Sequence, residues 1–205
     1  LLGRETVREI LGRKLGFHEL KLDDAAFEQD LGYPEALGLL AELQAEGARR
    51  GVAFGLKLCN TLPVANHRPV FDPAERRMYL SGRPLHALAV TLAHRLAEDL
   101  AEPPPMSFAA GADAGNVAAL LRCGMRTVTA CSDLLRPGGC LRLVQYLENV
   151  DTAMAADGAA TLDAFIRAGA RGARGAAAAA RLHLRRYAAR VLEDPALAKA
   201  SFDRT

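Results

Sequence analysis

Two glycine-containing turns in the second half of the chain carry the residues best suited to bind a ligand. The first, at residues 110–113, follows an apolar segment, so the backbone at Gly111 can approach a ligand and Asp113 can cap a helix that begins near Ala114. Backbone N–H groups at the start of a helix attract anions. A second segment ends at residues 131–133, shortly before a pair of glycines that offers further N–H groups. We therefore expect a phosphate-sized anion site between two strand ends, although glycines and capping residues also occur in βα loops that bind nothing.

Two other polar segments precede these turns. Asn60 and Thr61 follow a mostly apolar run at residues 52–59, and Ser81-Gly82 offers a tight turn whose backbone can approach a ring system. An amide and a hydroxyl at the carboxyl end of a strand can hydrogen-bond a cofactor or a substrate. The alternative is that both residues simply begin a turn before Pro63, because Asn and Thr favour turns.

The spacing of histidines and cysteines indicates no metal centre. His86 and His94 are too far apart for the one-turn pair that typifies helical zinc ligands, and we expect them to be structural or exposed. The four cysteines contain no C-x-x-C pair, so neither a zinc site nor an iron–sulfur cluster can be inferred from them: Cys59, Cys123, Cys131 and Cys140. We expect reduced thiols, most of them buried.

The elements that must position these residues alternate between helix and strand, as in a parallel α/β sheet. The long apolar run at 52–59 is typical of a central strand covered on both faces. Residues 63–78 are polar and predict a long connection whose His67 is a loop histidine or, less simply, an acid or base of an active-site lid. The pattern predicts four parallel strands, near residues 18–22, 52–59, 106–109 and 126–131, with helices at 7–15, after Pro34 and over 85–96.

Four short motifs, in this order, resemble the FMN-binding barrel of dihydroorotate dehydrogenases: Asn60-Thr61, Ser81-Gly82-Arg83-Pro84, Ala110-Gly111 and Cys131-Ser132. The segments CNTLPV, YLSGRPL and CSDLLRPGG are more similar still to the barrel of large flavin and iron–sulfur oxidoreductases of the selenate-reductase-like and glutamate-synthase-like group, relatives of dihydropyrimidine dehydrogenase. The resemblance covers most of the chain, most strongly from about His18 to Asn149. It implies the C-terminal half of a (β/α)8 TIM barrel, with about four parallel βα units.

The resemblance also implies a cofactor, FMN, with its phosphate held by the loops that follow the last two strands. The family's catalytic base and its flavin-edge lysine belong to earlier strands, so no catalytic residue is named and Lys57 receives no role. Iron–sulfur clusters are expected only in domains outside this chain. The residues that would contact the flavin are Asn60, Thr61, Ser81, Gly82, Gly111, Ala112, Cys131 and Ser132.

Two departures from the family pattern favour a second interpretation, a non-catalytic barrel module that serves as a scaffold for electron-transfer domains. Where dihydroorotate dehydrogenases have two glycines, Ala110 supplies a Cβ that could crowd the phosphate. Arg136-Pro137 replaces less bulky residues after the last strand. Neither change removes the N–H donors, so the sequence leaves both the flavin enzyme and the scaffold open.

Composition limits the class of protein. The chain has 205 residues, half of them hydrophobic, and a net charge of +2, which is ordinary for one globular domain. Charged residues interrupt every apolar run well before the roughly 20 residues of a membrane span, and we expect no signal peptide. We expect a cytoplasmic protein with no nucleic-acid or membrane partner.

The composition changes after Asn149, which divides the chain into residues 1–150, the half-barrel, and residues 151–205, an Ala/Arg-rich helical extension toward a downstream domain. Ala176 to Leu192 should be helical, with an arginine-rich face that we expect to be solvated or in contact with another part of the protein. Half a barrel leaves two sheet edges unpaired. We therefore expect the remaining N-terminal half-barrel and an iron–sulfur domain as partners, or a homodimer.

Overall fold

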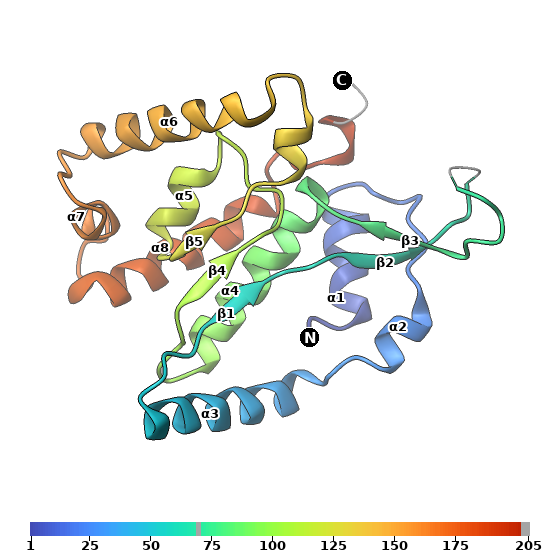
Figure 1. Cartoon of the computed structure of the whole chain (residues 1–205), viewed down its shortest axis with the longest axis horizontal. Helices are drawn as coiled ribbons and strands as arrows, with labels where there is room; N and C mark the ends of the chain where they lie inside the picture. Colours follow the sequence, from blue (N-terminus) through green and yellow to red (C-terminus); the bar gives the residue numbers. More distant parts are fainter. Residues whose placement is uncertain (69–70, 202–205) are drawn as a thin grey trace.

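The computed structural model describes residues 1–68 and 71–201, and three short parallel strands lie at its centre (Figure 1). They are β1 (Leu56–Leu58), β4 (Met106–Phe108) and β5 (Thr127–Val128), in the spatial order β1-β4-β5. Both pairings are parallel, and helices connect the strands. The predicted α/β class and three of the four predicted strands are therefore confirmed.

The register of the sheet separates an apolar row from a polar one. Leu58 pairs with Phe108, and Phe108 pairs with Val128. The adjacent row is Lys57, Ser107 and Thr127, which point to the opposite face because side chains alternate along a strand. Leu58 and Phe108 are buried, whereas Lys57 and Thr127 are exposed. One face of the sheet is thus the core and the other is polar and open.

Two of the strand predictions need correction. Residues 18–22 do not join the parallel sheet; Leu22 forms an isolated antiparallel bridge with Val64. The backbone there finds its partner in a neighbouring hairpin, since Ala65 N donates to Lys21 O over 2.8 Å. The 52–59 run is not central: β1 lies at the margin of the three-stranded sheet, and β4 occupies the middle. The described chain provides a strand on only one side of β1.

The polar connection predicted at residues 63–78 is largely a β-hairpin. β2 (Leu62–Ala65) and β3 (Arg77–Leu80) pair antiparallel, with Leu62 opposite Leu80. Only one position of β2, Val64, is buried, which explains why the segment has no long apolar run. His67 is exposed at the end of β2, and residues 69–70 of the predicted connection lie outside the described part. The hairpin projects away from the main sheet (Figure 1).

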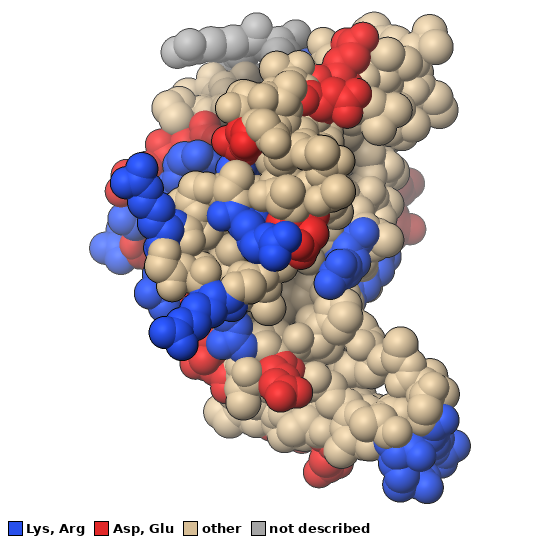
Figure 2. Space-filling view, turned by 90° about the vertical axis from the view of Figure 1, so that its left-hand side faces the viewer, with Lys and Arg blue, Asp and Glu red and all other residues tan. Residues whose placement is uncertain are grey.

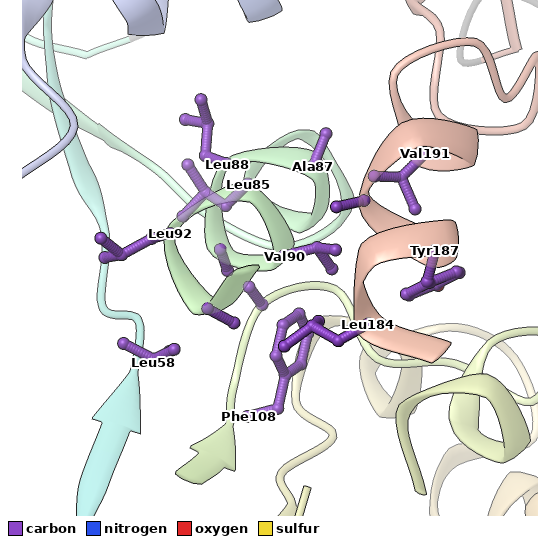
Figure 3. Close-up of a cluster of buried hydrophobic side chains, with 14 of the residues drawn as sticks. Leu58, Leu85, Ala87, Leu88, Val90, Leu92, Phe108, Leu184, Tyr187 and Val191 are labelled. Carbon is purple, nitrogen blue, oxygen red and sulfur yellow. The ribbon is translucent and has the colours of Figure 1, made fainter. Parts of the chain in front are cut away.

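The helix α4 (His86–Asp99) covers the apolar face of the sheet. Nine of the fourteen residues of α4 are buried, among them Leu88, Val90 and Leu92. Figure 3 shows Leu92 on the side of α4 that faces Leu58, and Val90 near Phe108 and α8 (Gly175–Val191). The remaining α-helices are α1 (Arg4–Arg8), α2 (Asp24–Glu28), α3 (Tyr33–Arg50), α5 (Val117–Arg122), α6 (Arg142–Ala156) and α7 (Leu162–Arg167).

Short irregular helices complete the chain. A π-helical segment (Glu9–Lys14) continues α1 and ends before Gly16, as the sequence predicts. Pro34 lies in the first turn of α3, also as predicted. The 3₁₀ segments are Arg83–Leu85, Ser132–Leu135, Gly139–Leu141 and Lys199–Ser201.

The predicted alanine-rich helix is α8, and it packs against α4 with Leu184, Tyr187, Ala188 and Val191 in the main core. Its arginines contact the rest of the chain: Arg185 pairs with Glu98 at 2.7 Å, and Arg181 donates to the carbonyls of Leu100 and Ala101. On the face shown in Figure 2, basic groups lie in separate clusters with acidic groups among them. The division of the chain into residues 1–150 and 151–205 stays a prediction. Residues 202–205, at the end of the second part, lie outside the described residues.

Candidate functional site

Five of the eight predicted flavin-contacting residues line one cavity of about 330 Å³. The cavity lies at the carboxyl ends of β4 and β5, where the turns after two parallel strands meet the loop that follows β3. Carboxyl ends of parallel strands are where α/β proteins place ligands. The five residues are Ser81, Gly82, Gly111, Ala112 and Ser132, and the cavity is also lined by Arg83, Pro84, Asp113, Asp133, Arg136 and Ser201.

Two glycines hold the three loops of this cavity against one another. Gly111 has φ +61°, and a Cβ added there would lie 2.4 Å from Arg83 Cα. Gly82 has φ +72°, and its Cβ would lie 2.8 Å from Ser132 Oγ. Both positions therefore require glycine for conformation and for close packing between loops. The role of Gly111 therefore differs from the expected one. The absence of a side chain at Gly111 makes room for the backbone of Arg83.

Asp113 caps the turn that leads into α5. Its Oδ1 accepts hydrogen bonds from Gly115 N (2.9 Å) and Asn116 N (3.1 Å), while Asn116 Oδ1 accepts from Asp113 N (3.0 Å). Such reciprocal bonds satisfy the free N–H groups of a helix start. Asp113 therefore caps the turn at residues 114–116, whereas α5 begins later than predicted, at Val117, with Asn116 as its N-cap and no side-chain cap bond. The cap also means that these N–H groups already have a carboxylate as their acceptor.

Asp133 anchors the second loop from a buried position. Arg142 donates two hydrogen bonds to its carboxylate, Nε to Oδ2 at 3.0 Å and an Nη2 contact to Oδ1 at 2.9 Å. The Tyr146 hydroxyl lies 3.0 Å from Asp133 Oδ2 and 2.9 Å from the Ala112 carbonyl. Burial by itself would raise the pKa of Asp133, but the hydrogen bonds from Arg142 and Tyr146 outweigh it and lower the pKa. The loop carrying Ser132 is therefore fixed to α6 by an ionised carboxylate.

The first loop is anchored from behind by a buried histidine. His86 Nδ1 lies 2.8 Å from the Ala110 carbonyl, so Nδ1 carries the proton, and Nε2 accepts from the Tyr187 hydroxyl at 2.6 Å. His86 is fully buried, which agrees with a structural role. Ala110 is also fully buried and does not line the cavity. Its side chain belongs to the core, so it does not narrow this cavity, contrary to expectation.

The other three predicted residues lie apart from this cavity. Asn60 is exposed beyond β1, where its Oδ1 is 3.5 Å from Lys57 Nζ. Thr61 lines a separate, largely apolar cavity of about 160 Å³ beneath α4. Cys131 is exposed and precedes the Ser132 turn without lining the cavity. The structure thus gathers the motifs after β3, β4 and β5 and leaves the β1 motif outside.

The cysteines differ from expectation in burial. All four are free thiols, but Cys131 and Cys140 are exposed, and only Cys123 is fully buried. The exposed pair follows β5, with Cys131 directly before the Ser132–Leu135 segment and Cys140 in the 3₁₀ segment Gly139–Leu141. Among residues 1–68 and 71–201, no three His, Cys, Asp or Glu side chains come together as a metal site.

Arginines are the site residues that the sequence reasoning missed. Arg83 and Arg136 both line the cavity, and Arg136 was treated only as a bulky replacement. Arg136 Nη1 lies 3.5 Å from Asp133 Oδ1, and its side chain is about half exposed. Because Arg142 already neutralises Asp133, Arg136 adds positive charge to the cavity mouth. A signal was present, since an arginine beside a predicted anion site is a natural phosphate ligand.

The arrangement can bind an anion and does not by itself supply acid–base chemistry. Hydroxyls at Ser81 and Ser132 and guanidinium groups at Arg83 and Arg136 are hydrogen-bond donors, and glycines leave the backbone accessible. The two carboxylates of the cavity are engaged, Asp113 in the helix cap and Asp133 with Arg142. The fold is that of a β/α domain, and the cavity lies at the carboxyl ends of its parallel strands, where such domains place ligands.

Comparison with known families agrees with that class and makes it specific. Residues 1–180 match the family described as oxidoreductase YgfK, N-terminal TIM-barrel domain. The chain belongs to this family. The match ends at residue 180, in the first part of α8, so it includes α5, α6 and α7, the helices between β4 and α8.

Two curated proteins illustrate the relationship. The chain is 38% identical over 151 residues to the protein named "Putative oxidoreductase YgfK" in Escherichia coli K12, and equally to the protein of that name in E. coli O157:H7. The alignment covers 74% of this chain and 14% of each relative, so the chain spans about one seventh of their length. No solved structure matches the chain. No helix within the described residues is long and apolar enough to cross a bilayer.

Proposed function

We propose that the chain is part of the barrel of a flavin-dependent oxidoreductase and that it holds the phosphate of FMN. The observation that carries this proposal is the cavity in which Ser81, Gly82, Gly111, Ala112 and Ser132 meet two arginines. Membership of an oxidoreductase TIM-barrel family makes a redox cofactor a natural occupant. The likeness of the four motifs to dihydroorotate and dihydropyrimidine dehydrogenases and to selenate-reductase-like enzymes suggests FMN in particular.

The residues of the cavity fit a phosphate group. Arg136 and Arg83 supply guanidinium donors, although each lies near a cavity carboxylate, Arg136 Nη1 at 3.5 Å from Asp133 Oδ1 and Arg83 Nε at 3.8 Å from Asp113 Oδ2. Ser132 and Ser81 supply hydroxyl donors, and the buried methyl of Ala110 leaves the cavity clear. Charge-assisted hydrogen bonds are each worth about 1.5–3 kcal/mol, so several together hold a phosphate firmly. When bound, the flavin would supply the electron transfer, and the chain would fix its position and keep a positive charge beside the phosphate.

The rest of the enzyme is proposed to lie outside this chain. In a barrel of this kind, the other βα units carry the catalytic base and complete the binding site for the flavin ring. Iron–sulfur domains then accept the electrons. The relatives are about seven times longer than the aligned segment, which leaves room for such domains. The chain is then the C-terminal half of the barrel, and the protein acts in the cytoplasm.

A specific observation favours the alternative, a barrel module that serves as a scaffold without flavin. Asp113 occupies Gly115 N and Asn116 N, two of the donors that a phosphate at this helix start would use. A carboxylate in that position also repels a phosphate. The two candidate functions therefore differ in whether the attraction of a phosphate by Arg83 and Arg136 exceeds its repulsion by Asp113.

Titration of FMN, riboflavin and inorganic phosphate into the purified chain tests the proposal. FMN and phosphate should bind, and riboflavin, which lacks the phosphate, should bind at least tenfold more weakly than FMN. Ser132→Ala and Arg136→Gln should each weaken FMN by about tenfold, which is about 1.4 kcal/mol. Arg167→Gln, on α7, is the matched control because Arg167 does not line the cavity. Equal affinity for FMN and riboflavin, or no effect of either variant, would leave the scaffold as the better account.

A further inference from the structure

A second polar cavity lies among the helices that follow β4, and it has a volume of about 300 Å³. α5, α6, α7 and α8 supply its lining, and these helices lie toward the left-hand side of Figure 1. Its charged lining residues are Arg122 of α5 and Arg186 and Arg190 of α8. Within the described part of the chain, no residue lines both this cavity and the candidate FMN cavity. We call it the α8 cavity.

Two of these arginines stack on aromatic rings of the same cavity. Arg122 Cζ lies 4.0 Å from the centre of the Phe165 ring, and Arg190 Cζ lies 5.1 Å from the centre of the Tyr187 ring. Both rings are buried, so they hold the guanidinium groups in place by cation–π contact. The N–H groups of a guanidinium lie in its plane, and stacking on a ring leaves them able to bind an anion.

The turn after α7 orients the other polar side chains of the cavity. The Gly169 carbonyl accepts a hydrogen bond from Arg186 Nη1 at 3.0 Å. The Ala168 carbonyl lies 2.9 Å from His183 Nε2, which therefore carries the proton, and 3.4 Å from Arg122 Nη1. A guanidinium has five N–H donors. These bonds therefore fix the positions of Arg122 and Arg186 and leave donors for a ligand.

Positive charge predominates in the α8 cavity. Among the residues that the structure describes, no Asp or Glu lines it. Arg122 forms an ion pair with Asp157, which follows α6, so a carboxylate balances one of the three guanidinium groups. Arg186 and Arg190, which are both exposed, bring two further positive charges. The cavity therefore suits a ligand with two negative charges.

Two neutral side chains of the lining respond to these charges. Burial lowers the pKa of His183, and the charges of Arg122 and Arg186 lower it further. Burial raises the pKa of the Cys123 thiol to about 12, and the charges of Arg190 and Arg122 oppose that rise. Since the field of each arginine reaches a side chain of the lining, the three charges act on the same space.

We propose that the α8 cavity binds the phosphate dianion of a small phosphorylated molecule. Guanidinium groups match the geometry of phosphate oxygens and bind them through two hydrogen bonds at once. A volume of about 300 Å³ is within the range of small-molecule sites, so the cavity admits part of the molecule beside the phosphate. The buried Phe165 and Tyr187 rings supply apolar surface for that part. Binding here does not require FMN, because the candidate FMN cavity is lined by other residues.

Titration of inorganic phosphate into the 205-residue chain, followed by the backbone amide signals in ¹H–¹⁵N NMR spectra, tests the site. The Gly169 amide reports on the α8 cavity, because the Gly169 carbonyl binds Arg186. Phosphate should shift this signal in the wild type. Arg186→Gln and Arg190→Gln should each raise the dissociation constant about tenfold or more. Their circular dichroism spectra should not change, because both side chains are exposed.

Arg185→Gln is the matched control, since Arg185 lies on the same helix but pairs with Glu98 and does not line the cavity. It should change the dissociation constant less than about twofold, because it removes only diffuse attraction that salt screens. Arg136→Gln, in the candidate FMN cavity, should also leave the Gly169 titration unchanged. Failure of one site is therefore distinguishable from failure of the other.

Three results would overturn the proposal. The first is an unshifted Gly169 amide, or an equal loss of affinity in Arg185→Gln, which would indicate only diffuse attraction to a basic helix. The second concerns acetate, a carboxylate with one charge, which should bind about tenfold more weakly than phosphate; equal affinity would identify a carboxylate site instead. The third is a single-stranded RNA oligonucleotide that binds far more tightly than phosphate and depends on Arg186 and Arg190, which would assign these arginines to a nucleic-acid surface.

Discussion

His86 Nε2 lies 2.6 Å from the Tyr187 hydroxyl, and this bond joins α4 to α8 inside the core. Both residues are buried, and the other nitrogen of His86 holds the Ala110 carbonyl beside the candidate site. Tyr187→Phe removes only the hydroxyl, which leaves the imidazole nitrogen without its donor. Because an unsatisfied buried polar group costs about 1–3 kcal/mol, the free energy of unfolding should fall by that amount. Urea denaturation measures it, and Tyr79→Phe, at an exposed tyrosine, should leave the midpoint unchanged.

The same histidine should make stability depend on pH. Burial lowers the pKa of His86 from its usual 6.5, more than the Ala110 carbonyl raises it. The unfolded chain therefore takes up the proton first as the pH falls. The contribution of His86 to the free energy of unfolding is complete above pH 6.5 and is lost as the pH falls from there toward the lowered pKa.

Denaturation midpoints between pH 8 and pH 5 check this prediction. His86→Gln should be less stable than the wild type at pH 8 because its shorter amide cannot reach both partners. Its midpoint should, however, decline less between pH 8 and pH 5. Parallel curves for the two proteins would show that His86 does not titrate in this range. His94→Gln, at a half-buried position on the same helix, serves as the comparison.

Asp133 should contribute stability over a more acidic range. Its pKa is lowered because the hydrogen bonds from Arg142 and Tyr146 exceed the opposing effect of burial. Its contribution is therefore complete above the usual value of 3.8 and is lost as the pH falls through the lowered pKa. Arg142→Leu leaves the buried carboxylate with a weaker set of partners and should lower the free energy of unfolding at pH 7.

Thermal unfolding of Arg142→Leu at pH 7 and pH 3 gives the comparison. The difference from the wild type should shrink at the lower pH, because the unfolded wild-type chain takes up a proton below the usual pKa of 3.8, which removes the advantage that Arg142 gives to the folded, ionised Asp133. Arg136→Leu should have a smaller effect, of less than about 1 kcal/mol, because the contact between Arg136 and Asp133 is longer and the Arg136 side chain is about half exposed. A larger loss from Arg136 than from Arg142 would contradict this account of the loop.

The sequence predicted local features better than the spatial arrangement of the sheet. Helices α3 and α8 follow from Pro34 and from the alanine-rich run, because helix signals are local. Three strands and the Asp113 cap were predicted for the same reason. The central position predicted for the strand at residues 52–59 was wrong. An apolar run indicates that the side chains of a strand are buried, but it does not indicate how many strands lie beside it.

For the candidate site, the sequence located the loops but not their contacts. Gly82 and Gly111 were read as places where a ligand approaches, whereas each is closed by another loop of the same chain. Contacts such as Gly111 with Arg83 join residues far apart in sequence, and no local spacing encodes them. Arg142 and Tyr146 were missed for that reason, since only the fold brings α6 to Asp133.

The four thiols should react in two classes. Cys131 and Cys140 are exposed, whereas burial raises the pKa of Cys59 and raises that of Cys123 to about 12. Since the thiolate is the nucleophile, two thiols should react with Ellman's reagent at pH 8 in the native protein, and four after unfolding in guanidinium. Peptide mapping should find the fast label on Cys131 and Cys140. Early labelling of Cys123 would show that the packing of α5 against α8 opens in solution.

Gly111→Ala should separate the packing role of this glycine from ligand binding. The new Cβ would meet Arg83 Cα at 2.4 Å, and φ of +61° is strained for any L side chain. The strain costs about 1–2 kcal/mol, and the clash with backbone adds to it, so the variant should lose at least about 2 kcal/mol of unfolding free energy without any ligand present. Gly115→Ala, at an exposed position in the next turn without positive φ, is the matched control and should change stability far less. If Gly111→Ala is as stable as the wild type yet no longer binds FMN, then the glycine admits the ligand and the contact with Arg83 is incidental.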